Sequence, residues 1–163
     1  GVAHAALGDR EAALVELAAI EALEPQVDEI FMGNVYPARD LLEIAKSLLR
    51  GEMAYRAGDA ANAVFAFEEA VTLQDALPYT EPPFWYYPTR QSLGAALLAS
   101  DRAAEAQVVF EADLEQYPMN GWSMFGLAEA LRRQGDEAGA EQMMARFETV
   151  WQFADVSLAT SIL

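Results

Sequence analysis

The sequence contains no cysteine, which excludes disulfide bonds, zinc sites built on thiolates and catalysis by a thiol. It also has no apolar run near the roughly 20 residues that a membrane-spanning helix requires. The first residues lack the charged and then apolar pattern of a secretion signal. We therefore expect no membrane insertion.

Basic residues are scarce: 10 Lys and Arg stand against 26 Asp and Glu, and the formal net charge is −16. Nucleic acids and anionic membranes both need a basic surface, so we expect neither as a partner. The acidity favours solubility and is compatible with a basic partner. The chain also lacks the G-x-S-x-G, H-E-x-x-H and glycine-rich phosphate-loop motifs, and His4 is its single histidine. We expect no enzyme activity, no cofactor and no metal site.

Apolar residues are abundant, at 53% of the 163 residues, and many of them are alanines. Alanine is the best helix former, so the composition favours an all-α fold. The length fits one domain with a sizeable buried core. Apolar spacing and turn residues predict helices over 10–23, 40–57, 60–74, 88–99, 103–116, 121–134 and 137–153, with residues 1–6 as the end of a further helix.

One pattern of small and apolar residues recurs along the chain. Its clearest copy is Arg90-x-x-Leu93-Gly94-x-x-Leu97, then Ala106-x-x-x-Phe110 and Pro118, and the next copy follows 34 positions later. Each copy predicts a pair of helices, A and then B, that buries its apolar face by stacking on neighbouring pairs. We expect small residues where A and B cross, and turns in which Gly ends one helix and Asp caps the next. The crossing residues are Gly51, Gly94 and Ala128; the turns are Gly8-Asp9, Gly58-Asp59, Gly135-Asp136 and, without glycine, Ser100-Asp101.

The spacing of the copies is not uniform. Gly1 and Gly51 are 50 positions apart, and Gly51 and Gly94 are 43 apart, so two insertions interrupt the repeats. Gly1 matches the middle of a helix A, which predicts either a C-terminal part of a longer protein or an end that pairs with another chain. We expect one solenoid over residues 1–163: partial repeat 1–27, insertion 28–43, repeat 44–77, insertion 78–86, repeats 87–120 and 121–153, and a segment 154–163 that folds back as a cap over the last helix pair.

These residues resemble the tetratricopeptide repeat family, and the resemblance covers nearly the whole chain. More narrowly, E-P-P-F-W-Y-Y-P-T-R-Q-S-L-G-A-A-L-L followed by N-G-W-S-M-F-G-L-A-E-A-L-R is similar to the C-terminal part of a group of bacterial tetratricopeptide proteins with no assigned activity. The resemblance implies a right-handed α-solenoid that binds proteins or peptides, in a bacterial cytoplasm or periplasm. Relatives in that group often have His where this chain has Tyr86, so no metal role is implied for this position.

The resemblance also implies a concave groove lined by fixed positions of each helix A. Members that hold a peptide carboxylate place Lys and Asn there, and this chain has neither, so that clamp is absent. Three arginines at groove positions either hold a ligand carboxylate or phosphate, or face the negative ends of their helices. Trp122 and Phe125 either anchor a peptide or pack under an insertion. The candidate groove residues are Tyr55, Arg56, Gln91, Trp122, Phe125, Arg132 and Arg133.

The insertion E-P-P-F-W-Y-Y-P, residues 81–88, brings four aromatic side chains to one loop. Pro88 suits the first turn of a helix. At least two of the aromatic side chains should pack against the helices over 60–74 and 88–99, because four cannot all face water cheaply. The others, with Arg90, would stand at the mouth of the groove. The loop residues Trp85, Tyr86 and Tyr87 are therefore either part of a connector or a ligand-lining wall.

The function we expect is a non-catalytic scaffold that binds a protein or peptide through the groove and the aromatic loop. Two alternatives stay open. A small-molecule or metal-binding function, or an accessory role to an enzyme, would place the chemistry in a missing upstream half. Self-assembly as a homo-oligomer would stack the first face of the solenoid on the last face of a neighbouring copy.

Overall fold

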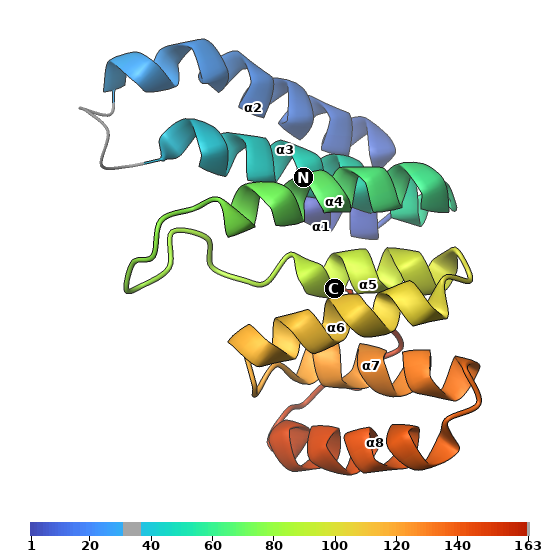
Figure 1. Ribbon diagram of the computed structural model, residues 1–163. Helices are drawn as coiled ribbons and strands as arrows, with labels where there is room; N and C mark the ends of the chain where they lie inside the picture. Colours follow the sequence, from blue (N-terminus) through green and yellow to red (C-terminus); the bar gives the residue numbers. More distant parts are fainter. Residues whose placement is uncertain (31–36, 163) are drawn as a thin grey trace. The chain divides into compact units, whose positions relative to one another are not determined.

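The computed structural model describes residues 1–30 and 37–162, and these residues form helices with turns and loops between them (Figure 1). The predicted all-α fold is confirmed for this part of the chain. The chain divides into two compact units, Gly1–Thr89 and Arg90–Leu163. The first unit contains α1 (Val2–Ala6), α2 (Arg10–Ile30), α3 (Ala38–Arg56) and α4 (Ala60–Asp75); the second contains α5 (Arg90–Ala99), α6 (Ala103–Gln116), α7 (Gly121–Arg133) and α8 (Glu137–Trp151).

In the first unit, α3 is the central helix and packs against α1, α2 and α4. Gly51 of α3 faces the fully buried ring of Phe67 in α4, and a Cβ atom at Gly51 would lie 2.6 Å from Cδ1 of that ring. Lys46 ties α3 to α2, because its ammonium group lies 3.0 Å from the carboxylate of Glu24. The crossing of α3 and α4 therefore depends on the missing side chain at Gly51, as the repeat pattern predicted.

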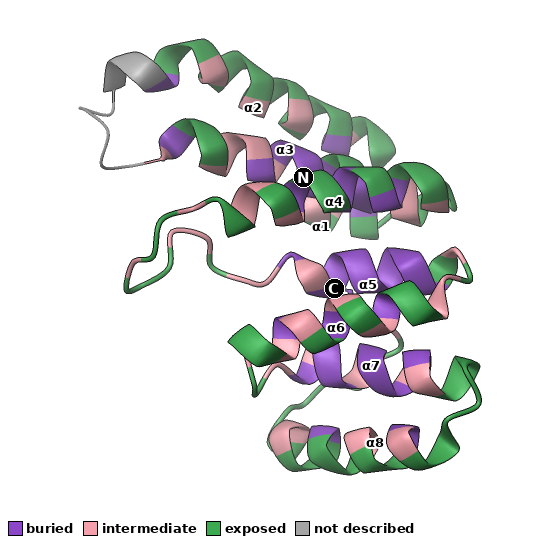
Figure 2. Cartoon of the chain, viewed as in Figure 1, coloured by how far each residue is buried: buried purple, intermediate pink, exposed green. Residues whose placement is uncertain are grey.

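In the second unit, α6 packs against α5 and α7, α7 packs against α8, and α5 and α7 also contact each other. The fully buried ring of Phe110 in α6 lies between Gly94 of α5 and Gly126 of α7. A Cβ atom on either glycine would lie 2.7 Å from Cε2 of the ring, and closer still to Cζ. Three helices thus meet at one ring. Figure 2 shows α5 as an almost continuously buried helix, and every residue from 91 to 98 is buried.

Three of the four turns between consecutive helices of a pair follow the predicted chemistry of glycine and a capping aspartate, and the fourth keeps the backbone geometry without the cap. These three contain a glycine with a positive φ, followed by an aspartate whose Oδ1 accepts a backbone N–H in the first turn of the next helix. These pairs are Gly8-Asp9, Gly58-Asp59 and Gly135-Asp136. In the turn between α5 and α6, Asp101 takes the left-handed position with a φ of 59°. Aspartate tolerates this conformation better than most residues do, so the turn keeps its geometry without glycine.

Several helix boundaries differ from the prediction by two residues or more, including those of α2 and α5. α2 continues through Pro25 to Ile30 instead of ending at residue 23, so part of the predicted insertion over 28–43 is helical; residues 31–36 lie outside the described residues. α5 begins at Arg90 rather than at residue 88, so Pro88 precedes the helix and does not form its first turn. The backbone N–H and the hydroxyl of Thr89 both donate to Gln74 Oε1, which fixes the chain before α5 begins.

Residues 152–162 have no regular structure and return across the second unit (Figure 1). The indole N–H of Trp151 donates to the carbonyl oxygen of Val156 at 2.8 Å. Ser161 Oγ donates to the carbonyl oxygen of Gln91 in α5 at 3.1 Å, and Ser161 and Ile162 are both buried. The return was predicted as a cap over the last helix pair, but the segment reaches α5 as well.

Candidate functional site

A cavity of about 300 Å³ lies in the first unit, between the aromatic loop and the first three helices. Three consecutive aromatic side chains of residues 85–87 form one part of its lining. Apolar side chains of α1, α2 and α3 form most of the remainder. The lining residues are Gly1, Val2, Ala3, Glu16, Ile20, Ala45, Leu48, Leu49, Trp85, Tyr86 and Tyr87.

The side chain of Gln74, at the end of α4, holds the aromatic loop in place. Its Nε2 donates to the carbonyl oxygen of Tyr87 at 3.1 Å, and its Oε1 accepts the N–H of Thr89 at 2.8 Å. Thr89 is completely buried. The side-chain amide of Gln74 therefore hydrogen-bonds to the backbone of both Tyr87 and Thr89 at the C-terminal end of the loop. These bonds fix the position of the aromatic residues that come just before Thr89.

The three rings of the loop contact one another and make a continuous wall. Their centroids are 5.4 Å apart for Trp85 and Tyr86, 4.8 Å for Tyr86 and Tyr87, and 6.2 Å for Trp85 and Tyr87. Trp85 and Tyr87 are half-buried, whereas Tyr86 is 83% exposed although it borders the cavity. The prediction was that at least two aromatic residues of the loop pack against the helices over 60–74 and 88–99. The residues that share the cavity with Trp85, Tyr86 and Tyr87 come from α1, α2 and α3.

The indole nitrogen of Trp85 is buried and has no hydrogen-bond partner among the described residues. A buried donor without an acceptor costs about 1–3 kcal/mol relative to a paired one. The arrangement of the loop around Trp85 is consequently less stable than one in which a small shift gives the N–H an acceptor.

One acidic side chain lines the cavity. Among the lining side chains that the structure describes, Glu16 is the one that carries a full charge, and no Lys or Arg side chain lines the cavity. Glu16 lies on the exposed side of α2. The cavity therefore combines aromatic faces, aliphatic walls and one carboxylate.

Arg56, which the repeat pattern placed in the groove, pairs with a buried carboxylate. Its Nε lies 2.7 Å from Oε1 of Glu52, and Glu52 is 3% exposed. Burial raises the pKa of Glu52, and the hydrogen bond from Arg56 opposes this rise. The guanidinium carbon of Arg56 lies 5.8 Å from the centre of the Tyr55 ring, so these two candidate residues also contact each other.

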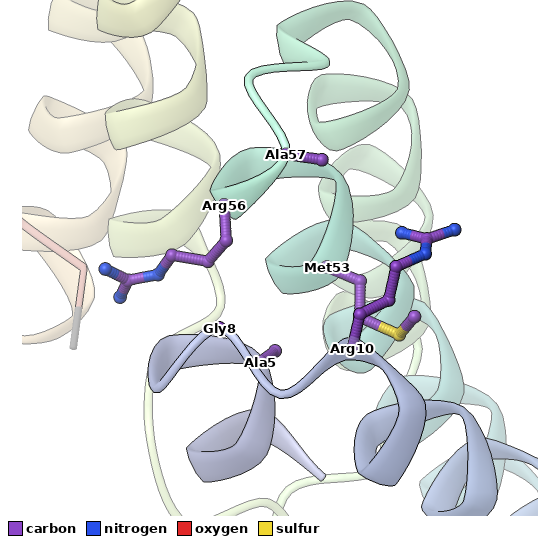
Figure 3. Close-up of a pocket in the computed structure, with 6 residues that line it drawn as sticks. All are labelled: Ala5, Gly8, Arg10, Met53, Arg56 and Ala57. Atoms are coloured by element: carbon purple, nitrogen blue, oxygen red, sulfur yellow. The ribbon is translucent and has the colours of Figure 1, made fainter.

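A second cavity, of about 160 Å³, lies beside Arg56 in the same unit (Figure 3). Arg10 and Met53 also line it, together with Ala5 of α1, Gly8 of the turn after α1 and Ala57 at the end of α3. In Figure 3 the guanidinium groups of Arg10 and Arg56 point away from each other. They are thus not arranged to hold one anion between them.

Arg132 and Arg133, in the last turn of α7, share Glu129 as a partner. The distances to its carboxylate oxygens are 3.1 Å from Arg132 and 2.7 Å from Arg133. The hydrogen bond from Arg133 lowers the pKa of Glu129. Arg133 also donates to the carbonyl oxygen of Leu98 at 2.6 Å, near the end of α5. These contacts join α5 to α7.

Trp122 and Phe125 pack between α7 and α8. Trp122 meets Trp151 edge-on at 5.3 Å between centroids, and Phe125 meets Phe147 at 5.6 Å. Phe147 and Trp151 stack on each other at 5.3 Å. The ring partners of the two candidate residues are Trp151 and Phe147 of the last helix, which were not among the predicted site residues.

A buried polar cluster in the second unit was not anticipated. Asp113 Oδ2 accepts from Ser123 Oγ at 2.6 Å and from Asn120 Nδ2 at 2.7 Å, and Asn120 Nδ2 also lies 3.3 Å from Oε1 of the candidate residue Gln91. Burial raises the pKa of Asp113, against the hydrogen bonds and against the charge of Arg90, also a candidate. Asn120 caps α7 as well, by accepting the N–H of residue 122. The cluster joins α5, α6 and the start of α7; the Asn-Gly sequence before α7 was its only local indication.

Two further properties concern the described residues alone. Within residues 1–30 and 37–162, no helix is both long enough and apolar enough to span a membrane. The same residues contain no group of three or more His, Asp or Glu side chains placed to hold a metal ion. No protein-family model matches the chain, and no match was found among curated proteins or among solved structures.

Proposed function

We propose that the chain is a tetratricopeptide-type scaffold that binds a peptide segment of a protein partner in the cavity under the aromatic loop, without catalysing a reaction. The observation that carries the proposal is the ring of Tyr86, which borders an apolar cavity of about 300 Å³ and is nevertheless 83% exposed. Tyr and Trp supply much of the binding energy at protein interfaces, because they offer a large rigid surface with a polar group at one end.

The repeat assignment is supported by two contacts of the same kind. Gly51 faces Phe67, and Gly94 faces Phe110; in each case the ring follows the glycine by 16 residues and joins the two helices of a pair. Turns with an aspartate cap at equivalent positions add to this agreement. A shared geometry at a shared spacing is the property expected of a structural repeat.

The binding role is supported by the make-up of the cavity. Ligand sites are concave, mostly apolar and furnished with a few polar groups. Here the aliphatic side chains of α1 to α3 supply the apolar part, and the Tyr86 hydroxyl and Glu16 supply the polar part. Residual instability around the unpaired indole N–H of Trp85 would allow the loop to adjust to an occupant.

The test uses a library of short peptides blocked at both ends, with binding followed by nuclear magnetic resonance of the backbone amides around the cavity. We expect at least one class of peptide to shift the amides of Ala3 and Tyr86. Tyr86→Ala should weaken that peptide by about tenfold, the equivalent of roughly 1.4 kcal/mol. Tyr79→Ala is the matched control, because Tyr79 is 85% exposed, precedes the same loop and does not line the cavity. A library in which no peptide perturbs the cavity, or equal losses in both variants, would contradict the proposal.

Self-association is a second candidate, and exposed apolar residues on α1 and α2 favour it. Leu7 after α1 is 84% exposed, and Val15 and Leu23 of α2 are 65% and 48% exposed. A partner surface would cover these side chains. Light scattering over a range of concentrations should then show a mass increase that Val15→Glu abolishes; a constant monomer mass would eliminate this candidate.

A further inference from the structure

We propose that the group bound in the cavity is a cation on an alkyl stem, namely a Lys or Arg side chain of a basic peptide segment. This inference rests on the proposed function, since it assumes that the cavity takes a peptide. It adds the chemistry of the partner, which the shape of the cavity alone does not define.

The first argument is charge. Glu16 borders the cavity, and no basic side chain of the lining opposes it. The whole chain carries a formal charge of −16, so its field attracts basic segments and repels acidic ones. An acidic or phosphorylated ligand would be disfavoured by the net negative charge of the chain and by the carboxylate of Glu16.

The second argument is the aromatic wall. The negative face of an aromatic ring attracts a cation that lies within about 6 Å of its centre, and Trp and Tyr are better partners than Phe. Trp85, Tyr86 and Tyr87 all contribute to the lining, and the ring of Tyr86 is largely open. A guanidinium or ammonium group placed against this wall would face both π electrons and the acidic side of the cavity.

The third argument is size and apolar surface. A volume of about 300 Å³ is at the small end of ligand sites, so it suits one long side chain rather than a large cofactor. Val2, Ile20 and Leu48 provide aliphatic surface beside the rings. The methylene groups of Lys and Arg pack on such surface while the charged head stays near polar groups. A small compact cation would leave these walls uncovered.

The experiment compares three N-acetylated tripeptide amides, Ala-Lys-Ala, Ala-norleucine-Ala and Ala-Glu-Ala, by titration of the full chain under nuclear magnetic resonance. Norleucine keeps the alkyl stem of Lys and lacks its charge. We expect the Lys peptide to bind at least fivefold more tightly than the norleucine peptide, and the Glu peptide more weakly than either. Because Gly1 lines the cavity, the titration is repeated after the α-amino group of the chain has been acetylated. The preference for Lys should then remain or increase.

Two pairs of variants locate the effect. Glu16→Gln should reduce the preference for Lys over norleucine by about threefold or more, whereas Glu11→Gln, which removes the same charge from the exposed start of α2, should not. Tyr86→Phe should keep the preference and Tyr86→Leu should lose most of it, since only the former keeps an aromatic face. Equal binding of the Lys and norleucine peptides would overturn the inference and leave the proposed function standing, provided that binding stays sensitive to Tyr86→Ala. Failure of the proposed function is recognised separately, by a peptide library in which nothing perturbs the cavity.

Discussion

Replacing Gly94 with alanine tests the contact that sets the packing of α5 against α6. The added Cβ would lie 2.7 Å from Cε2 of Phe110, roughly 1 Å inside the usual carbon–carbon contact distance. The ring cannot retreat toward α7, because Gly126 meets it from that side at an equally short distance. Overpacking of this kind costs about 1–3 kcal/mol. Alanine offsets about 1 kcal/mol through its better helix propensity, so we expect a net loss of up to about 2 kcal/mol.

The assay is a double-mutant cycle with Phe110→Leu, measured by urea unfolding followed with far-ultraviolet circular dichroism. Leucine lacks the outer ring atoms that the new Cβ would strike, although Phe110→Leu alone leaves a gap that costs roughly 1–2 kcal/mol. In that background, Gly94→Ala should be neutral or should stabilise the protein by up to about 1 kcal/mol. The coupling energy between the two positions should therefore be about 1–3 kcal/mol.

Equal costs of Gly94→Ala in the two backgrounds would refute this reasoning. A parallel cycle with Gly51→Ala and Phe67→Leu probes the equivalent contact of the first unit and should give coupling of the same sign. The mixed pair, Gly51→Ala with Phe110→Leu, joins residues from different contacts. It should be additive within about 0.5 kcal/mol.

Three further predictions concern charge and backbone strain. Because burial raises the pKa of Asp113, its carboxyl group destabilises the fold once it ionises. Asp113→Asn should therefore gain stability relative to the wild type as the pH rises from about 3 to about 7, measured by urea unfolding. A difference in unfolding free energy between the two proteins that stays constant with pH would contradict this. Arg56→Gln leaves the carboxylate of Glu52 buried without its cation and should lower the unfolding free energy by about 1–2 kcal/mol near neutral pH. This loss of stability should shrink on acidification, as Glu52 takes up a proton. A loss that does not depend on pH in the same unfolding series would contradict this. Asp101→Gly relieves the positive φ and should raise the thermal midpoint by about 2–4 °C, whereas Asp101→Ala should lower it; equal midpoints in calorimetry would show that the turn is unstrained.

The helices and turns could be predicted from the sequence because their causes are local. Gly58 and Asp59 stand next to each other, and the turn they specify depends on their own backbone preference and on a hydrogen bond three residues away. The contact of Gly94 with Phe110 was also accessible, since its spacing repeats that of Gly51 and Phe67. In these cases the pattern of neighbouring residues is sufficient to predict the local structure.

The candidate site could be predicted only in part. Trp85, Tyr86 and Tyr87 are conspicuous in the sequence, but the cavity also needs Val2 and Glu16. These two residues come from helices roughly 70 to 85 residues earlier and have ordinary amphipathic surroundings. No pattern in the residues next to the loop indicates which face of α1 or α2 it approaches. The long α2 is a similar case, because Pro25 normally predicts a helix end, and the prediction missed the ion pair between Glu24 and Lys46 of α3.

The buried cluster around Asp113 shows the opposite difficulty. Asp113, Asn120 and Ser123 belong to residue types that are mostly found at protein surfaces, yet each is paired with another once the helices meet. Burial of polar groups is acceptable when hydrogen bonds replace water, and this replacement is a property of three helix ends together. The residues can be recognised only after the helices have been arranged.

The hydrogen bond between Ser161 and Gln91 spans 70 residues, whereas each helix pair of the second unit forms from neighbouring segments. During synthesis on the ribosome, α5 emerges long before Ser161 does, so one side of α5 stays uncovered while α6, α7 and α8 are being made. The docking of this irregular segment therefore follows the formation of the helix pairs, and the nascent chain passes through a period in which another polypeptide can occupy its place.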